Sequence, residues 1–481
     1  MISAVVIPLL LATCFIFIFP RLRNWWISEQ NTGIPFIHGH LILGSTQYFT
    51  KRDEFLEDNF SQLNSSIFRF RILFYSVVAL RGKAACSLFF TNKSLGWEDG
   101  YRLMHGMAPK PRDASIKEDA APASHSMVKR VSVMLKTDYY ERMLPQMLRI
   151  VEHTLESHKE DSFNPFHILE PVRPPQPNRI LWLKHSCKFV VRVMLNFLVA
   201  EKMADAPGHT SAMTASITQL ASVGSMLSIV FPWLPTPYRL KKLNAVKNYY
   251  FLVSKLVAQR KKEKNPEADI LQYLLDEGDS MKNIFSCFTL FLFAGVLETP
   301  PTLSWIMIYL STSPEWKQRA QEEVEAFLAQ HCPIPRGTSS LAEYLAQAPL
   351  ETWETDLPVL DAILNETVRL TLTGAFIRRN TGDDFVFEGN IIRNGDFLTY
   401  PVSDQHLNPN NFTNPLEFNP HHHLGVDTAG KFWGVWRRHP CVGKRFAHIM
   451  AKTYIVSLLT GYDHTVVDAQ GNPFYHTPGP T

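Results

Sequence analysis

The stretch Arg437-Arg438-His439-Pro440-Cys441-Val442-Gly443-Lys444-Arg445-Phe446-Ala447 decides how the rest of the chain is interpreted. Its one cysteine follows basic residues and opens a run in which apolar side chains recur at helical spacing, at Phe446, Ile449, Met450 and Tyr454. Near a helix N-terminus and fixed positive charge, the ionised form of a cysteine is stabilised by unpaired N–H groups and Coulomb attraction. We therefore predict that Cys441 is a thiolate that binds iron. The alternative is a small buried hydrophobe, which is our interpretation of the other five cysteines.

The composition is that of a large globular protein. With 481 residues, of which 45% are hydrophobic and 12% aromatic, the chain has enough apolar side chains for a sizeable core. The formal net charge is only +3, which gives no reason to expect nucleic acid as a partner. The six cysteines are scattered and form no CxxC pair, so a reducing compartment is expected.

The N-terminus carries a membrane signal. Residues Ile2 to Phe19 are almost wholly apolar, and Arg21 and Arg23 follow directly. At about 1.5 Å per residue, about 18 such residues are just long enough to cross a hydrocarbon core. A cleaved signal peptide would have basic residues before the apolar run and a clear small-x-small site after it, and this chain has neither. We predict a retained transmembrane helix over 1–20, a linker over 21–35 and a catalytic domain over 36–481 on the cytoplasmic side.

Most of the remaining chain is predicted to be helical, with a small β part. Two strand-like runs lie between Ile67 and Leu80, and Phe385 to Tyr400 is typical of a hairpin segment with a turn at Asn394-Gly395. The apolar run from Ile284 to Leu310 is interrupted by a glycine, a glutamate and two prolines, which favours a buried central helix over a second membrane span. Ser313-Pro314-Glu315 then indicates the capped start of another helix.

The central helix contains Ala294-Gly295-Val296-Leu297-Glu298-Thr299-Pro300-Pro301. Because proline has no N–H, the carbonyls of Val296 and Leu297 lose their partners four residues on, and an opened turn is expected there. Gly295 leaves space in this turn, while Glu298 and Thr299 place an acid and a hydroxyl beside it. These residues are predicted to line a pocket. The alternative is a proline-kinked core helix in which Thr299 bonds back to a carbonyl.

A second helix, between Val359 and Leu370, carries Glu366 and Arg369. The i, i+3 spacing places the carboxylate and the guanidinium on one face, where a two-pronged ion pair can form. Taken alone, this pair is a weak signal, because many exposed helices carry it.

In their order and separations, these three motifs resemble those of the cytochrome P-450 family. That family has an oxygen-activation helix with a glycine, an acid and a threonine, then an ExxR helix, and near the C-terminus a loop with an aromatic residue, a glycine-bearing turn, Arg or His, any residue, Cys, any residue and Gly. The resemblance implies a mainly α cytochrome P-450 fold with a minor β part. It also implies haem b, held between the central helix and the cysteine loop.

The resemblance assigns roles by position. Cys441 is implied to be the axial ligand of the haem iron, and Glu366 and Arg369 are implied to be structural. The residues implied to act on or lie beside the haem are Thr299 and Glu298 as catalytic groups, and Ala294, Gly295 and Gly443 as cofactor neighbours. His439, together with Arg378 or Arg379, is implied to bind the haem propionates, since a buried dianion needs cations. The alternative for the two arginines is a surface pair.

Two positions depart from the family pattern. Arg437 stands where the family has a glycine, and Phe418-Asn419-Pro420-His421-His422-His423 stands where it has Pro-x-Arg-Phe. We expect His422 to replace the arginine that completes a cluster with Glu366 and Arg369. A metal site made by the triple histidine is disfavoured, because adjacent histidines point in different directions.

The implied activity is that of a membrane-anchored haem-thiolate monooxygenase, resembling fungal enzymes of specialised metabolism. It would insert one oxygen atom from dioxygen into a small hydrophobic substrate, a secondary metabolite. The chain has no flavin or nicotinamide fingerprint, so electrons are expected from NADPH through a separate cytochrome P-450 reductase. Lys444, Arg445 and Lys452 are candidates for its basic docking face, or are solvated side chains.

The expected location is the endoplasmic reticulum membrane. Two alternatives stay open. One is a haem-thiolate isomerase or dehydratase that does not use dioxygen, and the other is a haem-deficient inactive member of the family.

Overall fold

The computed structural model describes residues 33–40, 43–73, 75–104, 135, 137–160, 189–199, 208–221, 236–264, 266–267, 269–372, 374–425 and 441–462. The predicted membrane helix over 1–20, most of the linker over 21–35, and both Arg437 and His439 lie outside the described residues.

The described helices precede and follow a small β part. In chain order they are α2 Gln47–Thr50, α3 Arg52–Leu63, α4 Lys83–Thr91, α5 Glu98–Met104, α7 Thr137–Glu160, the helix Phe189–Val199, α9 His209–Ala221, α11 Pro237–Arg260, α12 Ile270–Asp276, α13 Met281–Thr312, α14 Pro314–His331, α15 Leu341–Leu345, α16 Leu350–Thr355, α17 Pro358–Thr371, α18 Ser403–His406, the 3-10 turn η1 Pro420–His422 and α19 Lys444–Gly461. The strands are β1 Ile67–Ile72, β2 Tyr75–Leu80, β3 Leu95–Gly96, β4 Ala375–Asn380, β5 Phe385–Phe387, β6 Asn390–Ile392 and β7 Phe397–Pro401. The prediction of a mainly α fold with a minor β part is confirmed.

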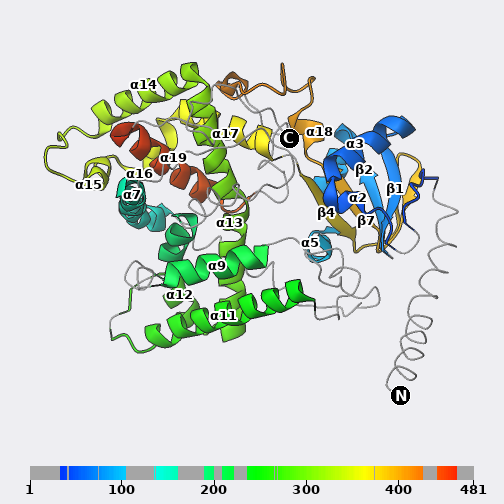
Figure 1. The fold of residues 1–481 in the computed structure, drawn as a ribbon, viewed down its shortest axis with the longest axis horizontal. Helices are drawn as coiled ribbons and strands as arrows, with labels where there is room; N and C mark the ends of the chain where they lie inside the picture. The colour runs from blue at the N-terminus through cyan, green and yellow to red at the C-terminus, as the bar shows by residue number, and fades with distance from the viewer. Residues whose placement is uncertain are drawn as a thin grey trace.

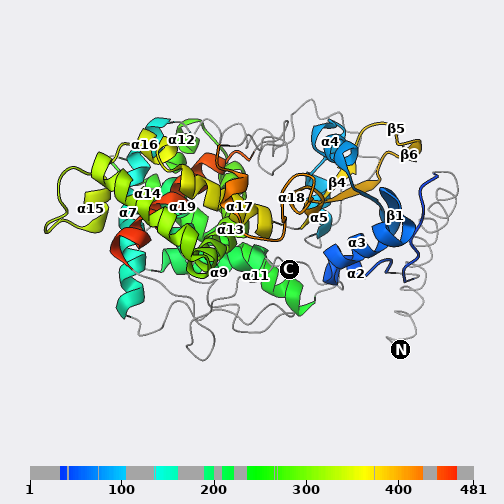
Figure 2. The ribbon, with the colours of Figure 1, turned by 90° about the horizontal axis from the view of Figure 1, so that it is seen from above.

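The β part and the helical part occupy different sides of the molecule. In Figure 1 the strands gather at one side with α2 and α3, and the long helices α7, α11, α13 and α14 form the other side. Figure 2 shows the same separation from above, with α5 and α18 between the two parts.

The main sheet has five strands in the order β1-β2-β7-β4-β3. Only β2 and β7 pair in parallel, and the other neighbours are antiparallel. The two strands predicted between Ile67 and Leu80 are confirmed as β1 and β2. Every residue of β1 is buried, its arginines included. Arg69 is accommodated because it makes a 3.0 Å ion pair with Asp396, next to β7.

The predicted hairpin segment is also confirmed. β5 and β6 pair antiparallel across Glu388 and Gly389, which both have positive φ, of 49° and 77°. Two positive φ values belong to the tight turn whose twist matches a hairpin. A second turn at Asn394-Gly395 leads into β7, which pairs with β4 in the main sheet.

α13 is the central element of the helical part. It contacts α9, α11, α14, α17 and α19. Among the described residues it is the one helix long and apolar enough to cross a membrane, but its contacts with five other helices are those of a core helix, as predicted. α13 runs without interruption through Pro300 and Pro301. The predicted opened turn therefore does not interrupt the helix, although the two prolines provide no N–H groups to it.

The next helix, α14, begins where the sequence indicated. Its predicted inward residues Trp316, Ala320, Val324 and Phe327 are buried. Ser313 is the N-cap residue, but its side chain makes no capping hydrogen bond. Here the proline at the first helical position defines the start of the helix.

Candidate functional site

Cys441 lies directly before α19. Gly443 is the N-cap residue of this helix, and the N–H of Lys444 donates to the Cys441 carbonyl oxygen at 3.2 Å. The predicted apolar face of α19 is confirmed, with Phe446, Ile449 and Met450 buried and Tyr454 packed at the edge of the core.

An aromatic cluster holds the start of α19 against two other helices. The Phe446 ring lies 4.8 Å from that of Phe197, on the helix Phe189–Val199, and 5.8 Å from that of Phe291, on α13. Phe197 and Phe291 stack at 4.9 Å. Since Phe446 follows the cysteine by five residues, these contacts bring Cys441 to the side of α13 on which Phe291 lies.

The Cys441 thiol does not ionise as readily as predicted. Burial raises the pKa of Cys441, and this outweighs the amides of Gly443 and Lys444 and the positive charge of Lys444, which favour the thiolate. The negative charge of Glu298 on α13 raises the pKa of Cys441 further. The helix-start amides and Lys444 act in the predicted sense, but burial has the larger effect on the pKa of Cys441, and the iron-bound thiolate stays a prediction. A metal cation at the sulfur would supply the missing charge compensation.

Ala294 and Glu298 lie on the face of α13 that is accessible to solvent, in the middle of a mostly buried helix. They are four residues apart and therefore point the same way. Burial nevertheless raises the pKa of Glu298. The Glu298 carboxyl is therefore accessible and yet surrounded by enough protein to raise its pKa, as expected for the predicted pocket. Cys441 has the same combination of an accessible side chain and a pKa raised by burial.

Gly295 does not border that space. A side-chain carbon built at Gly295 would collide with the thioether end of Met194, which is buried on the helix Phe189–Val199. The prediction that Gly295 leaves room in a pocket is therefore wrong. Its missing side chain allows two helices to approach each other closely.

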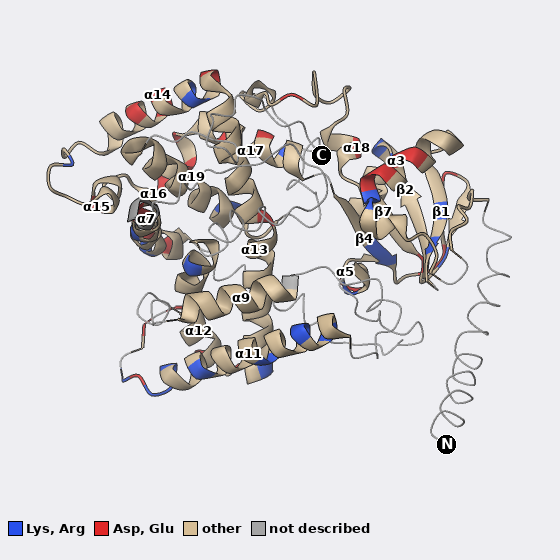
Figure 3. Cartoon of the chain, viewed as in Figure 1, with Lys and Arg blue, Asp and Glu red and all other residues tan. Residues whose placement is uncertain are grey.

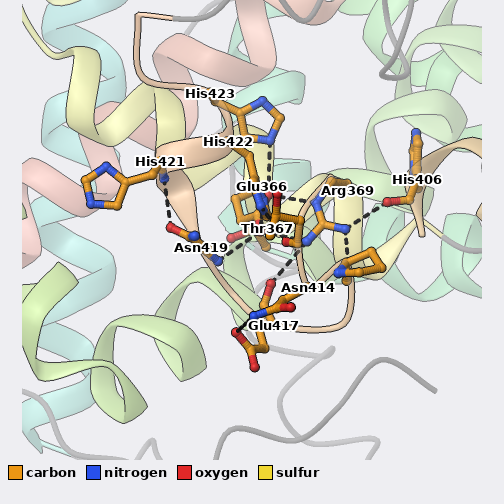
Figure 4. Close-up of polar contacts among 12 residues, drawn as sticks. Glu366, Thr367, Arg369, His406, Asn414, Glu417, Asn419, His421, His422 and His423 are labelled. Carbon is orange, nitrogen blue, oxygen red and sulfur yellow. Dashed lines mark hydrogen bonds and ion pairs between the residues drawn. The ribbon is translucent and has the colours of Figure 1, made fainter. Parts of the chain in front are cut away.

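Glu366 and Arg369 form a buried two-pronged ion pair on α17, as predicted. Arg369 Nε donates to Glu366 Oε2 at 2.8 Å and Nη2 to Oε1 at 2.7 Å, and neither side chain is accessible to solvent. Arg369 also donates to the carbonyl oxygens of His406, Pro415 and Glu417. His406 is the last residue of α18, and the other two acceptors lie in the segment between α18 and η1. Figure 4 shows His406 and Glu417 beside Arg369. The pair thus attaches this segment to α17.

His422 joins the pair, which confirms the predicted replacement for an arginine. Its Nδ1 lies 3.2 Å from Glu366 Oε1 and its Nε2 lies 2.9 Å from the carbonyl oxygen of Thr413. Both neighbours are hydrogen-bond acceptors. His422 therefore occupies the place at Glu366 that the family gives to an arginine.

The sequence analysis missed His423 in this cluster. His423 Nε2 lies 3.1 Å from Glu366 Oε2, and the Asn419 N–H donates to Oε1 at 2.9 Å. Burial alone would raise the pKa of Glu366, but the hydrogen bonds from Arg369, His422 and His423 hold it well below its usual range. In Figure 4, His421 points away from the cluster. Within the described part of the chain, no three His, Cys, Asp or Glu side chains are grouped to hold a metal ion.

Arg378 and Arg379 are both buried, so the alternative of a surface pair is wrong. They are neighbours on β4 and point to opposite faces of the sheet. Arg378 donates to the Phe89 carbonyl at 2.9 Å and lies over the rings of Phe89 and Phe90 on α4, and burial lowers the pKa of Arg378 to about 10. Arg379 makes a 2.8 Å ion pair with Asp99 on α5.

Two of the three candidate docking residues are engaged within the protein. Lys452 is buried, and its Nζ donates to Asp361 at 2.8 Å and to the Trp353 carbonyl at 3.0 Å. Arg445 makes a two-pronged ion pair with Glu354. Lys452 therefore offers no charge to a partner, and that interpretation is wrong for it.

The cytochrome P-450 family model matches residues 40–479. The chain belongs to the cytochrome P-450 family. This P-450 is 25% identical to the cytochrome P450 monooxygenase AacuE of Aspergillus aculeatus over 92% of its own length and 89% of that protein. It is 26% identical to the cytochrome P450 monooxygenase dmxR5 of a Cryptosporiopsis species over 90% of its own length and 83% of that protein.

A solved structure has the same fold. Cyanobacterial CYP120A1 with retinoic acid bound superposes with a TM-score of 0.66, covering 94% of this P-450 and 97% of that chain at 20% identity. Family membership makes the protein a P-450 monooxygenase that uses haem iron, and members of this family generally take electrons from a redox partner and bind hydrophobic substrates.

The described residues of this P-450 fit a haem. Cys441 supplies an accessible sulfur, which is the ligand type expected. On the opposite side Ala294 has only a methyl group, and at Gly443 an added side-chain carbon would meet no atom within 4 Å. Arg378 and Arg379 supply buried cations.

Proposed function

We propose that this P-450 inserts one oxygen atom from dioxygen into a C–H bond of a small apolar compound of fungal secondary metabolism. The balance is one substrate C–H, one dioxygen, two electrons and two protons, giving one alcohol and one water. The single observation that carries the proposal is the match of the cytochrome P-450 family model over residues 40–479, within which Cys441 lies directly before α19. The fungal monooxygenases among the relatives support it.

Haem would be held by residues from three elements. Cys441 would bind the iron from the start of α19, with Gly443 leaving room for the porphyrin edge, and Ala294 would face it from α13. When bound, haem supplies the redox chemistry of dioxygen, and the cysteine thiolate donates electron density that favours O–O cleavage. The chain's own contribution is to exclude water, position the substrate and deliver protons.

Arg379 is the better candidate for a haem propionate than Arg378. Its face of β4 is covered by α5, which lies between the sheet and the helical part in Figure 2. Arg378 points instead toward α4, where a carbonyl and two aromatic rings already surround it. In this arrangement the ion pair with Asp99 keeps the Arg379 guanidinium in place beside the proposed cofactor. His439 stays a prediction for the other propionate.

Electrons are proposed to come from NADPH through a separate reductase, with the catalytic part on the cytoplasmic side of the endoplasmic reticulum membrane. The apolar run from Ile2 to Phe19 supports this location. The described residues add a second feature, on α11. Its inner face, with Tyr249 and Val253, is buried, yet Leu243 and Phe251 on the outer face are 57% and 59% exposed.

The charge on α11 matches a lipid surface. The helix contains lysines and arginines along its length and no aspartate or glutamate, as Figure 3 shows. Exposed apolar side chains flanked by basic residues are typical of a helix that lies on an anionic membrane. We therefore include α11 in the membrane-contacting surface.

The test is product formation by the full chain in vesicles with reductase, NADPH and isotopically labelled dioxygen, using a panel of small apolar compounds. The proposal expects a product that carries one labelled oxygen atom and is absent without reductase. Formation of a rearranged or dehydrated product without dioxygen would instead establish the isomerase or dehydratase alternative.

A further inference from the structure

One face of α19 carries basic residues that are bound by acidic residues of α16 and α17, which lie beside it in Figure 1. Arg445, His448 and Lys452 are spaced i, i+3 and i+7 and therefore share one side of the helix. Arg445 pairs with Glu354 on α16, while His448 and Lys452 share the carboxylate of Asp361 on α17. The helix that begins after the cysteine thus carries a charged group that the proposed function does not use.

Lys452 occupies one oxygen of that carboxylate. Its Nζ donates to Asp361 Oδ2 at 2.8 Å. It also donates to the carbonyl oxygens of Trp353 at 3.0 Å and Glu354 at 3.3 Å. Because an ammonium has three N–H donors, Lys452 has none left for another partner. The other oxygen of Asp361 is available to His448.

His448 is the histidine of this group. Its Nδ1 lies 3.2 Å from Asp361 Oδ1. Burial would raise the pKa of Asp361, but the hydrogen bonds from His448 and Lys452 hold that pKa below its usual range, so the group is a carboxylate at neutral pH. A carboxylate only accepts, which places the proton of the neutral imidazole on Nδ1 and leaves Nε2 to bind a second one. The side chain is 18% exposed, so water reaches the ring.

Opposing influences act on this imidazole. Burial lowers the pKa of His448, the hydrogen bond and the charge of Asp361 raise it, and the charges of Lys444 and Lys452 lower it further. The resulting pKa is below the usual value of about 6.5. Titratable groups on the other helices packed against α19 face residues other than His448. They are Glu323 on α14, Glu343 on α15, Glu354 on α16, Glu152 and Tyr140 on α7, and Glu298 on α13.

The place of His448 on α19 brings it near the predicted iron ligand. It lies in the second turn of the helix, and Cys441 lies directly before the first, so the axial separation is on the order of 10 Å. This is about one Debye length at physiological ionic strength, and charges inside a protein are screened less than charges in water. A proton gained at His448 therefore acts on the charge at an iron bound to Cys441.

We propose that His448 takes up a proton from water when the iron bound at Cys441 is reduced. This inference rests on the proposed haem site and deepens it, because it assigns a proton acceptor to the step of electron uptake. The balance is one electron from the reductase to the ferric iron and one proton from water to His448 Nε2. Asp361 accepts from Nδ1 before and after this step, and so keeps the ring in place.

Electron uptake and proton uptake are then linked, and the linkage is reciprocal. Reduction raises the affinity of His448 for a proton, and a bound proton raises the reduction potential of the iron. Since the pKa of His448 in the oxidised chain lies below the usual value, the potential should fall with rising pH between about pH 5 and 7. The slope should correspond to no more than one proton for each electron.

The experiment is a spectroelectrochemical titration of the haem-loaded full chain from about pH 5 to 8, for the wild type, His448→Gln and His331→Gln. Glutamine keeps an N–H donor for Asp361 but does not titrate. His331→Gln is the matched control, because His331 forms the same kind of pair with Asp356, at 2.8 Å, outside the charged group of α19. The reduction potential is measured without substrate or turnover.

The potentials of the wild type and of His331→Gln are expected to fall with rising pH, whereas His448→Gln should lose most of this slope. Equal slopes in the wild type and His448→Gln would overturn the inference. If His448→Gln does not bind haem, the protons taken up by the wild type on reduction near pH 6 are counted in weakly buffered solution. A fraction of one proton for each electron is expected, and no uptake would overturn the inference. A wild-type protein without haem, or without a thiolate-type optical band, would instead overturn the proposed haem site itself.

Discussion

Replacing His422 by alanine should destabilise the protein measurably. The variant loses the contact of Nδ1 with Glu366 at 3.2 Å and of Nε2 with the Thr413 carbonyl at 2.9 Å. A hydrogen bond to a charged group contributes about 1.5–3 kcal/mol and a neutral one about 1 kcal/mol, so the expected loss is about 2.5–4 kcal/mol. The upper end applies if no water replaces the lost contact at the Glu366 carboxylate, which is fully buried.

His421 provides the matched control. It is the same residue type one position earlier, but its ring lies against Trp316 and its Nε2 lies 3.0 Å from Arg319 at the surface. His421→Ala should therefore cost under about 1 kcal/mol, as exposed pairs do. His422→Arg should retain more stability than His422→Ala, since it places a guanidinium donor beside Glu366.

The assay is urea unfolding of the full chain in detergent, followed by tryptophan fluorescence at neutral pH. A double-mutant cycle of His422→Ala with Glu366→Gln isolates the coupling between the two side chains. The reasoning about His422 would be refuted if His422→Ala cost no more than His421→Ala, or if the cycle gave a coupling of zero.

Three further predictions concern His406, the two arginines of β4 and the exposed face of α11. Burial lowers the pKa of His406 to about 3 in the folded chain, below the usual value of about 6.5, so the fold favours the neutral ring. The free energy of unfolding therefore keeps the full contribution of His406 above pH 6.5 and falls by up to about 1.4 kcal/mol per pH unit below it. His406→Asn should flatten this slope when the free energy of unfolding is measured between pH 7 and 5. Arg379→Ala should reduce the haem content of the purified protein several-fold more than Arg378→Ala, as determined by the haem-to-protein absorbance ratio, and equal losses would contradict the assignment to Arg379. With the full chain in anionic vesicles, brominated lipids should quench the fluorescence of a tryptophan introduced by Phe251→Trp. They should not quench that of Ile334→Trp, at a position that is also exposed. Equal quenching of the two would contradict the assignment of α11 to the membrane surface.

Local sequence patterns predicted the elements that depend on local interactions. The turn at Asn394-Gly395 requires a backbone conformation that glycine adopts easily, and the structure has φ of 86° there. The Glu366–Arg369 pair follows from i, i+3 spacing on one helix. Such features need no information about distant parts of the chain.

Features that depend on distant packing could not be derived in this way. Nothing near Gly295 indicates that Met194, on another helix, lies against it. The burial of Lys452 requires Asp361 and Trp353 from other helices. The raised pKa of Cys441 depends on burial, which the local pattern of basic residues does not reveal. In each case the sequence identifies the residue, but the neighbours that surround it come from distant segments that the local pattern does not predict.

The register of an acid and a hydroxyl on α13 is an intermediate case. A helical wheel already separates Glu298 from Thr299 by about 100°, but the helices that surround α13, among them α19 and the helix Phe189–Val199, follow only from contacts in the fold. His423 is similar, because the sequence shows three adjacent histidines and only the fold shows that two of them reach Glu366.

The most direct test of a cysteine-ligated haem in this chain is the optical spectrum of the reduced, purified protein under carbon monoxide, compared with that of Cys441→Ser. A strongly red-shifted Soret band in the wild type that disappears in the variant is the predicted result. A protein without haem, or a band that is unchanged when the sulfur is replaced, would contradict it.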